Sequence, residues 1–182
     1  MPHEVRSPAG IIVAMRGRAK TPLIVGGALL ACLAVALVTL RIVGLDPRER
    51  RPGLWLTGEL VTKPVPDWSF TDKYPTIFVQ TRSWYGLPHS VTTTCIAHNG
   101  QLYLTSVYRP GGQFPRGRLW NRNIVRDPHV RLKIGDQVFD RTVALVTDPA
   151  EKDAVLATKA KKYPQQRISD KSLVYVFRVQ SG

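Results

Sequence analysis

A run of 19 residues without a charged side chain, from Pro22 to Leu40, constrains this chain more than any other feature. A bilayer core about 30 Å thick is crossed by about 20 apolar residues in a helix. The guanidinium of Arg41 can snorkel to the interface, which lets residues 42–45 extend the apolar stretch. We therefore predict one transmembrane helix over residues 22–45, preceded by a basic tail at residues 1–21.

A buried core helix and a cleaved leader are the two alternatives for this segment. A buried core helix normally keeps one polar edge, and this segment has none. Cleavage is the second alternative, since Leu29-Leu30-Ala31-Cys32 is similar to a lipobox and Ala34-Val35-Ala36 to a signal-peptidase site. Apolar residues continue past both sites to Leu40, where a cleaved leader would give way to polar sequence. An uncleaved anchor is therefore preferred.

The flanks of the predicted span leave its orientation open. Four basic residues precede it within residues 1–21, and four follow it within residues 41–51. The positive-inside rule therefore favours neither orientation of the span clearly. We expect a single-pass protein of a bacterial-type inner membrane, with the side of the C-terminal domain undecided.

The net charge of +13 lies mostly in the C-terminal part of the chain. Residues 41–182 carry 22 basic and 12 acidic residues, a net charge of +10. Such a surface suits an anionic ligand, an anionic lipid surface or nucleic acid. Nucleic acid is disfavoured because neither an RNA-recognition signature nor a zinc knuckle is present. Two cysteines and four scattered histidines also argue against a disulfide scaffold and a metal site.

Residues 46–66 contain four prolines, namely Pro47, Pro52, Pro64 and Pro66. Proline lacks a backbone N–H and interrupts helices and sheets. We predict a stalk here, leading to a domain at residues 67–182. The apolar residues 54–56 within it are expected either at the membrane interface or packed on the domain.

An Asn99-Gly100 pair between two β-rich runs, residues 90–97 and 101–108, predicts a hairpin. Further strands are predicted at residues 76–81, 130–134, 137–146 and 172–179, with Gly135-Asp136 closing a second hairpin. Two short helices are expected, one at 118–126 and one from an Asp148 N-cap, with Glu151 closing a capping box, to about Lys162. Six strands with two helices predict an α+β, mainly β, antiparallel barrel. No Rossmann or P-loop glycine motif occurs.

Residues 67–182 resemble the split β-barrel family of flavin- and deazaflavin-binding proteins, which includes pyridoxamine 5′-phosphate oxidases and F420-dependent reductases. The resemblance is carried by residues 89–92, by Asn99-Gly100-Gln101-Leu102-Tyr103 and by residues 120–132. It implies a six-stranded antiparallel split barrel that binds FMN or F420, or less readily haem, often at a dimer interface. The cofactor-binding positions that it implies are Ser90, Thr92, Thr105, Ser106, Arg116, Arg118 and Asn121.

The loop before the first short helix supports an anion site. Arg109, Arg116, Arg118 and Arg122 lie within 14 residues. Arginine offers a planar fork that matches phosphate, and a helix N-terminus adds free amides. A solvated basic face is the alternative. Trp120 is a further candidate, either stacked on the cofactor ring or packed between helix and barrel.

Two functions remain in competition. The first is a membrane-anchored oxidoreductase that acts on a small or lipophilic substrate such as a quinone. The second is a non-catalytic accessory subunit of a membrane complex, which the absence of a recognisable acid–base set favours. A homodimer or a partner in a membrane complex is expected in either case, and no catalytic residue is assigned. Since the cofactor carries out hydride transfer, a missing acid–base pair does not exclude an enzyme.

Overall fold

The computed structural model describes residues 20–49, 51–166, 168–169 and 171–181, and the chain divides after Val38 into two compact units. Helix α1, Lys20–Val43, starts in the first unit. Its residues Ile24–Val43 are predominantly apolar, none of them is buried, and their length suffices to cross a membrane. A signal sequence passes the same test, so α1 is a candidate span.

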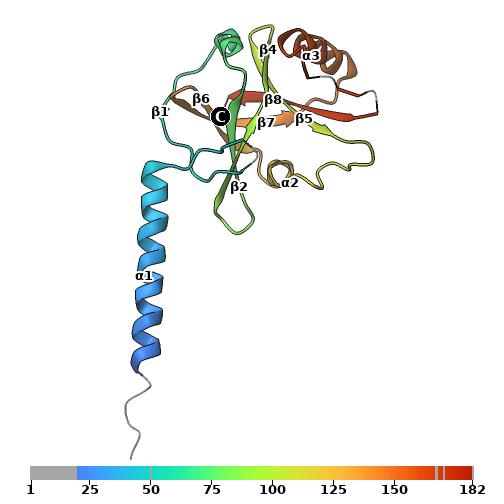
Figure 1. The fold of residues 1–182 in the computed structure, drawn as a ribbon. Helices are drawn as coiled ribbons and strands as arrows, with labels where there is room; N and C mark the ends of the chain where they lie inside the picture. The colour runs from blue at the N-terminus through green and yellow to red at the C-terminus, as the bar shows by residue number, and fades with distance from the viewer. Residues whose placement is uncertain (1–19, 50, 167, 170, 182) are drawn as a thin grey trace, which may run out of the picture. The chain divides into compact units, whose positions relative to one another are not determined.

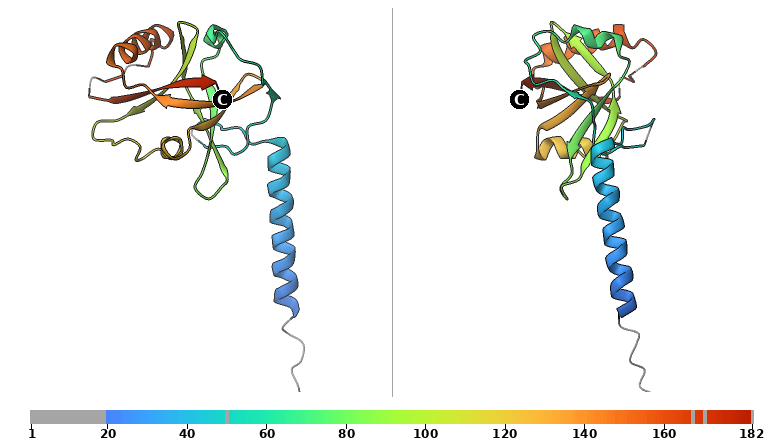
Figure 2. Two further views of the ribbon diagram at one scale, coloured as in Figure 1. Left: turned by 180° about the vertical axis from the view of Figure 1, so that it is seen from behind. Right: turned by 90° about the vertical axis from the view of Figure 1, so that its left-hand side faces the viewer.

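The second unit is built around one curled antiparallel sheet (Figures 1 and 2). Its strands follow the order β3-β2-β6-β7-β8-β5-β4, and β1 pairs with β7 in parallel. The two ends of this path, β3 and β4, are separated in sequence only by Thr94, so the sheet curls back on itself. The strands are β1 Glu59–Leu60, β2 Ile77–Arg82, β3 Pro88–Thr93, β4 Cys95–His98, β5 Gln101–Tyr108, β6 His129–Ile134, β7 Gln137–Leu145 and β8 Leu173–Ser181.

The mainly β, antiparallel class is confirmed, but the predicted count of six strands is wrong. The described residues form eight strands. The predicted strand 90–97 is two strands, because β3 pairs with β2 whereas β4 pairs with β5. The short strand β1 was also missed, since it lies in the proline-rich segment.

Three helical segments accompany the sheet in this unit: the 3₁₀ helix η1, Ser69–Lys73, and the helices α2, Leu119–Arg126, and α3, Pro149–Lys162. Asp148 caps α3 as predicted and accepts from the N–H groups of Ala150 and Glu151, at 3.3 and 3.1 Å. Glu151 does not close a capping box. Its carboxylate instead accepts from the Tyr103 hydroxyl and from Nε of Arg178, each at 2.8 Å.

The predicted hairpin at Asn99-Gly100 is confirmed. His98 pairs with Gln101, and both turn residues are left-handed, with φ of 50° and 76°. Two successive left-handed residues are what a type I′ turn requires, which explains the Asn-Gly pair. The second predicted hairpin also forms, with Ile134 opposite Gln137.

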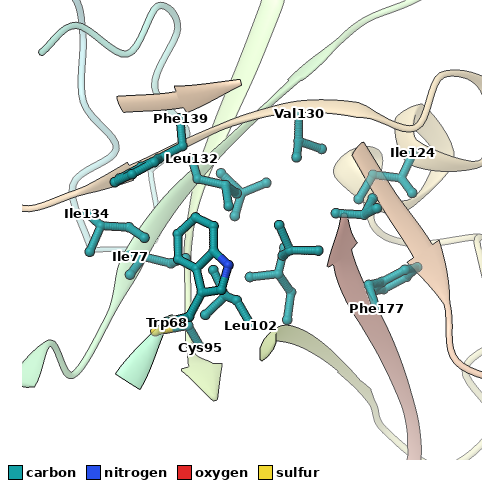
Figure 3. Close-up of a cluster of buried hydrophobic side chains, with 14 of the residues drawn as sticks. Trp68, Ile77, Cys95, Leu102, Ile124, Val130, Leu132, Ile134, Phe139 and Phe177 are labelled. Atoms are coloured by element: carbon teal, nitrogen blue, oxygen red, sulfur yellow. The ribbon is translucent and has the colours of Figure 1, made fainter. Parts of the chain in front are cut away.

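Apolar side chains pack on both faces of the curled sheet. The interior cluster centres on Trp68, which Figure 3 shows among Ile77, Leu102 and Leu132. The second cluster lies on the outer face, where Val155 of α3 is fully buried. Neighbouring residues of a strand therefore belong to different clusters, as the period of two in a strand demands. On β5, Leu102 and Leu104 belong to the interior cluster, whereas Tyr103 belongs to the outer one.

The segment between α1 and the sheet is packed against the rest of the second unit. The N–H of Leu45 donates to the carbonyl of Trp55 at 2.9 Å. Gly53 and Ser90 exchange two backbone hydrogen bonds, at 2.9 and 3.1 Å. Leu56 is 1% exposed, so at least this residue of the apolar triplet 54–56 packs on the domain. We call residues 45–56 the strap.

Candidate functional site

The predicted site residues separate into groups because Thr105 and Ser106 face opposite sides of β5. The hydroxyl of Ser106 accepts a hydrogen bond from Asn121 of α2, on the interior side. The hydroxyl of Thr105 meets Thr94 and Lys159 of α3, on the outer side. These two neighbours therefore do not contact one ligand together.

On the interior side, the side chain of Asn121 donates hydrogen bonds to two residues of β5. Its Nδ2 donates to Oγ of Ser106 at 2.7 Å and to Oη of Tyr108 at 2.6 Å. Its Oδ1 is buried without a hydrogen-bond partner among the described residues. The Arg118 guanidinium lies 5.5 Å from the centre of the Tyr108 ring and donates to the carbonyl of Val107 at 2.5 Å. Ser106 and Asn121 therefore hold Tyr108 in place, and Tyr108 supports Arg118.

Arg118 borders a shallow hollow of about 360 Å³ that is open to solvent and lined by the loop between β5 and α2. Its basic lining consists of Arg109, Arg116 and Arg118, no carboxylate lines it, and Gly111, Gly112 and Gly117 form part of its wall. None of the three arginines takes part in the ion pairs that the described residues form. We call this feature the arginine hollow. Its surplus of positive charge fits a phosphate or carboxylate group.

An aromatic group adjoins the arginine hollow. The rings of Phe114 and Tyr175 are stacked, with centroids 4.4 Å apart and planes at 23°. Tyr108 meets Tyr175 edge-on at 5.5 Å. Phe114 and Tyr175 pack against the interior cluster, and Tyr108 connects this group to the hollow that it lines.

Four predicted site residues thus come together around Tyr108, namely Ser106, Arg116, Arg118 and Asn121. The other four lie elsewhere, namely Ser90, Thr92, Thr105 and Trp120. Trp120 is 5% exposed and belongs to the interior cluster, with its ring 5.7 Å from that of Phe177. Of the two roles considered for Trp120, packing matches this position.

Ser90 lies beneath the strap. It is fully buried, and a Cβ at Gly53 would come within 2.5 Å of its hydroxyl oxygen. Thr92 is half-buried two residues along β3, on the same face. The hydroxyls of both residues lack a hydrogen-bond partner among the described residues. Ser90 and Thr92 are not among the residues that line the arginine hollow.

Thr105 belongs to a polar cluster that the sequence analysis missed. Nζ of Lys159 donates to Oγ1 of Thr94 at 3.2 Å and to Oγ1 of Thr105, and the two hydroxyls lie 3.2 Å apart. Lys159 is 3% exposed, and burial lowers its pKa from 10.5 to about 8. The signal was its position in the helix, since Lys159 follows the buried Val155 by four residues and shares its face.

A larger groove, of about 790 Å³, lies against β2, β6 and β7. Much of its charge is neutralised internally. The Arg131 guanidinium donates two hydrogen bonds of 2.7 Å to the Asp140 carboxylate. These bonds lower the pKa of the Asp140 carboxyl. Asp127 accepts from His129 at 2.7 Å. The volume suits a small organic molecule, but its charges favour an anion less than those of the arginine hollow.

The described part of the chain holds no group of three His, Cys, Asp or Glu side chains that could bind a metal ion. The ionisable side chains around the arginine hollow are arginines and Tyr108. The hollow therefore offers anion binding and electrostatic stabilisation, whereas proton transfer by an acid–base pair is not built into its lining.

No protein-family model matches the chain, and no curated protein matches it either. The chain is similar to the solved structure of an F420-H2 dependent reductase, FDR-A, with 26% identity and a TM-score of 0.45 over 59% of this chain and 95% of that one. It is also similar to a NimC/NimA family protein from Clostridium acetobutylicum, with 12% identity and a TM-score of 0.45 over 60% of this chain and 76% of that one. A third similar structure is a protein from Listeria innocua assigned as a pyridoxamine 5′-phosphate oxidase, with 18% identity and a TM-score of 0.43 over 62% of this chain and 90% of that one. These structures include the two groups that the sequence resemblance named.

Proposed function

We propose that the domain binds a planar redox cofactor with an anionic tail, FMN or F420, and that the tail occupies the arginine hollow. The observation that carries this proposal is the hollow itself, with three arginines and no carboxylate around about 360 Å³. Guanidinium groups bind phosphate and carboxylate through paired hydrogen bonds. The glycines in the wall let a ligand approach the backbone closely. Haem is the less favoured cofactor, since none of the residues that line the hollow is a haem-iron ligand of the histidine, cysteine or methionine type.

In this proposal Arg116 and Arg118 bind the anionic tail, and Ser106 and Asn121 act as positioning residues. Asn121 fixes Tyr108 at 2.6 Å, and the Tyr108 ring supports the Arg118 guanidinium. Ser90, Thr92 and Thr105 require a second site or a movement of the strap to contact the same molecule. A bound flavin or deazaflavin supplies hydride transfer, and the protein supplies its position and electrostatic surroundings.

The cofactor and the candidate span together favour a membrane-anchored oxidoreductase. Residues 22–45 would form the anchor, residues 46–66 the connection and residues 67–182 the split-barrel domain. The anchor would bring the domain to substrates dissolved in the membrane, which favours a small or lipophilic substrate such as a quinone. We propose a single-pass protein of a bacterial-type inner membrane that forms a homodimer or joins a membrane complex.

The test begins with the absorbance spectrum of the full-length protein purified in detergent, followed by titration with FMN, F420 and haem. We expect flavin or deazaflavin absorbance, or binding of the added cofactor. The double variant Arg116→Ala/Arg118→Ala should weaken this binding at least about tenfold, since each lost charged hydrogen bond costs about 1.5–3 kcal/mol. Arg51→Ala, which removes an exposed arginine outside the hollow, is the matched control. Failure to bind FMN and F420, or equal binding by the double variant, contradicts the proposal.

An accessory subunit is the alternative, and the lining of the hollow favours it, because no acid–base pair is present there. This function predicts that the protein co-purifies with integral membrane proteins. It also predicts that the cofactor-loaded protein does not turn over when it is supplied with a reductant and a quinone. Turnover in that assay by the purified chain alone would support the enzyme instead.

A further inference from the structure

The β2–β3 hairpin ends in an exposed aromatic tip. Trp84 is 80% exposed, Tyr85 53% and Leu87 37%. The turn is closed by its own backbone, because the N–H of Ser83 donates to the carbonyl of Leu87 at 2.9 Å and that of Gly86 to the carbonyl of Ser83 at 3.0 Å. The hairpin projects past the body of the sheet (Figures 1 and 2). A well-formed turn thus holds two large aromatic rings in solvent.

Helix α2 places a basic face next to this tip. Arg122, Val125 and Arg126 are spaced three and four residues apart and share one side of the helix, and Val125 is 60% exposed. The opposite side is buried against the barrel. The guanidinium of Arg126 donates to the carbonyl of Arg82 at the base of the hairpin, which brings the two elements together. We call the residues Trp84, Tyr85, Leu87, Arg122, Val125 and Arg126 the aromatic–arginine surface.

The two arginines of this surface form no ion pair within the described part of the chain. Arg122 and Arg126 are absent from all the ion pairs found there, whereas the hydrogen bond from His129 and, to a smaller extent, the charge of Arg82 at the base of the hairpin lower the pKa of the Asp127 carboxyl. The nearby carboxylate of Asp127 accepts from His129 at 2.7 Å. The surface therefore combines exposed aromatic rings with unpaired arginines.

We propose that the aromatic–arginine surface docks on the headgroup region of an anionic bilayer. Tryptophan and tyrosine concentrate at this depth, because their rings are apolar at one end and polar at the other. Anionic headgroups attract the neighbouring arginines. The inference rests on the proposed anchor. Helix α1 ends at Val43, and the strap begins to pair at Leu45, so the tether is short and keeps lipid at high local concentration.

Spin labelling of the full-length protein in vesicles that contain phosphatidylglycerol tests this proposal. The label is placed at Tyr85→Cys in a Cys32→Ser background, where Cys95 is buried and unreactive. We expect the label to be more accessible to membrane-dissolved oxygen than to a water-soluble nickel chelate. A label at Gln165→Cys, exposed beyond the end of α3, is the matched control and should show the reverse order. Arg122→Gln/Arg126→Gln should move the label at position 85 toward the order of the control.

A label on the native Cys32 reports on the anchor separately, since this residue lies within α1. Oxygen access at Cys32 together with nickel access at position 85 overturns the docking surface and leaves the anchor standing. Nickel access at both positions overturns the anchor as well. Spin–spin broadening at position 85 that disappears when unlabelled protein is mixed in identifies a second copy of the chain as the occupant and also overturns the proposal. Cofactor binding is measured independently, so these failures are distinguishable from failure of the arginine hollow.

Discussion

Replacing Lys159 by methionine is expected to stabilise the barrel domain at neutral pH. The amine is 3% exposed and contacts only the hydroxyls of Thr94 and Thr105 among its described hydrogen-bond partners. Burial lowers its pKa from 10.5 to about 8, which corresponds to a cost of at most about 3–4 kcal/mol, since each pKa unit is worth about 1.36 kcal/mol. The hydroxyls and nearby solvent screen part of this charge, and the amine's hydrogen bonds offset about 1 kcal/mol more. We expect a net gain of about 1–2 kcal/mol for Lys159→Met.

The gain should depend on pH in a definite direction. Below about pH 8 the amine is protonated in both the folded and the unfolded chain, so the full cost of burying the charge is present. Between pH 8 and 10.5 the folded protein releases the proton while the unfolded chain retains it, so the stability of the wild type rises with pH. The advantage of Lys159→Met should therefore shrink as the pH is raised through this range.

Thermal unfolding of the full-length protein in detergent, followed by tryptophan fluorescence, measures this difference. A gain of 1–2 kcal/mol corresponds to a rise in Tm of about 2–8 °C for a chain of this size. Lys161→Met, on the same helix but exposed, is the control and should change the free energy of unfolding by less than about 0.5 kcal/mol. A Tm below that of the wild type at neutral pH, or an advantage that does not change with pH, would refute the reasoning.

Three further predictions concern the strap and the site. Gly53→Ala should loosen the strap, because the new Cβ would lie 2.1 Å from the carbonyl oxygen of Leu45. We expect faster tryptic cleavage within residues 46–66. Gly27→Ala is the control, since a Cβ there meets nothing within 4 Å. Asn121→Ala should lower stability by about 2–3 kcal/mol, since Ser106 and Tyr108 lose their donor, and should also weaken FMN binding. Asn123→Ala, on the same helix, is the control, because it removes a buried donor to Thr81. It should lower Tm about as much as Asn121→Ala does and leave FMN binding intact. If both variants lose FMN binding equally, Asn121 has no positioning role.

The parts of the fold that could be predicted are those decided by local chemistry. Asn99-Gly100 predicts its hairpin because only certain residues tolerate two successive left-handed conformations. Asp148-Pro149 predicts the start of α3 because a side-chain cap and a fixed φ act within one turn. In both cases the residues that determine the structure are adjacent in the sequence.

The strand count could not be predicted from residues 90–97, because the break at Thr94 is a change of partner. Nothing in this run separates the part that pairs with β2 from the part that pairs with β5. Strand β1 was missed for the same reason, since its partner β7 lies far along the chain. Long-range pairing decides both features.

The separation of Thr105 from Ser106 could be predicted from the sequence. Once residues 101–108 are assigned to a strand, adjacent side chains must point to opposite faces. The two hydroxyls could then have been separated without any structure. Lys159 was also within reach, because a lysine four residues after Val155 falls on the apolar face of the predicted helix.

The basic side chains of this domain differ in whether they are paired with a carboxylate and in whether they are exposed. This difference favours the arginine hollow as the anion site. Arg131 and Arg178 are occupied by the carboxylates of Asp140 and Glu151. Lys159 is unpaired but enclosed between α3 and the sheet. An anionic ligand needs positive charge that is both free of a carboxylate and open to solvent. Arg122 and Arg126 meet both conditions too, but Arg109, Arg116 and Arg118 also line one open hollow, which favours an anion site there.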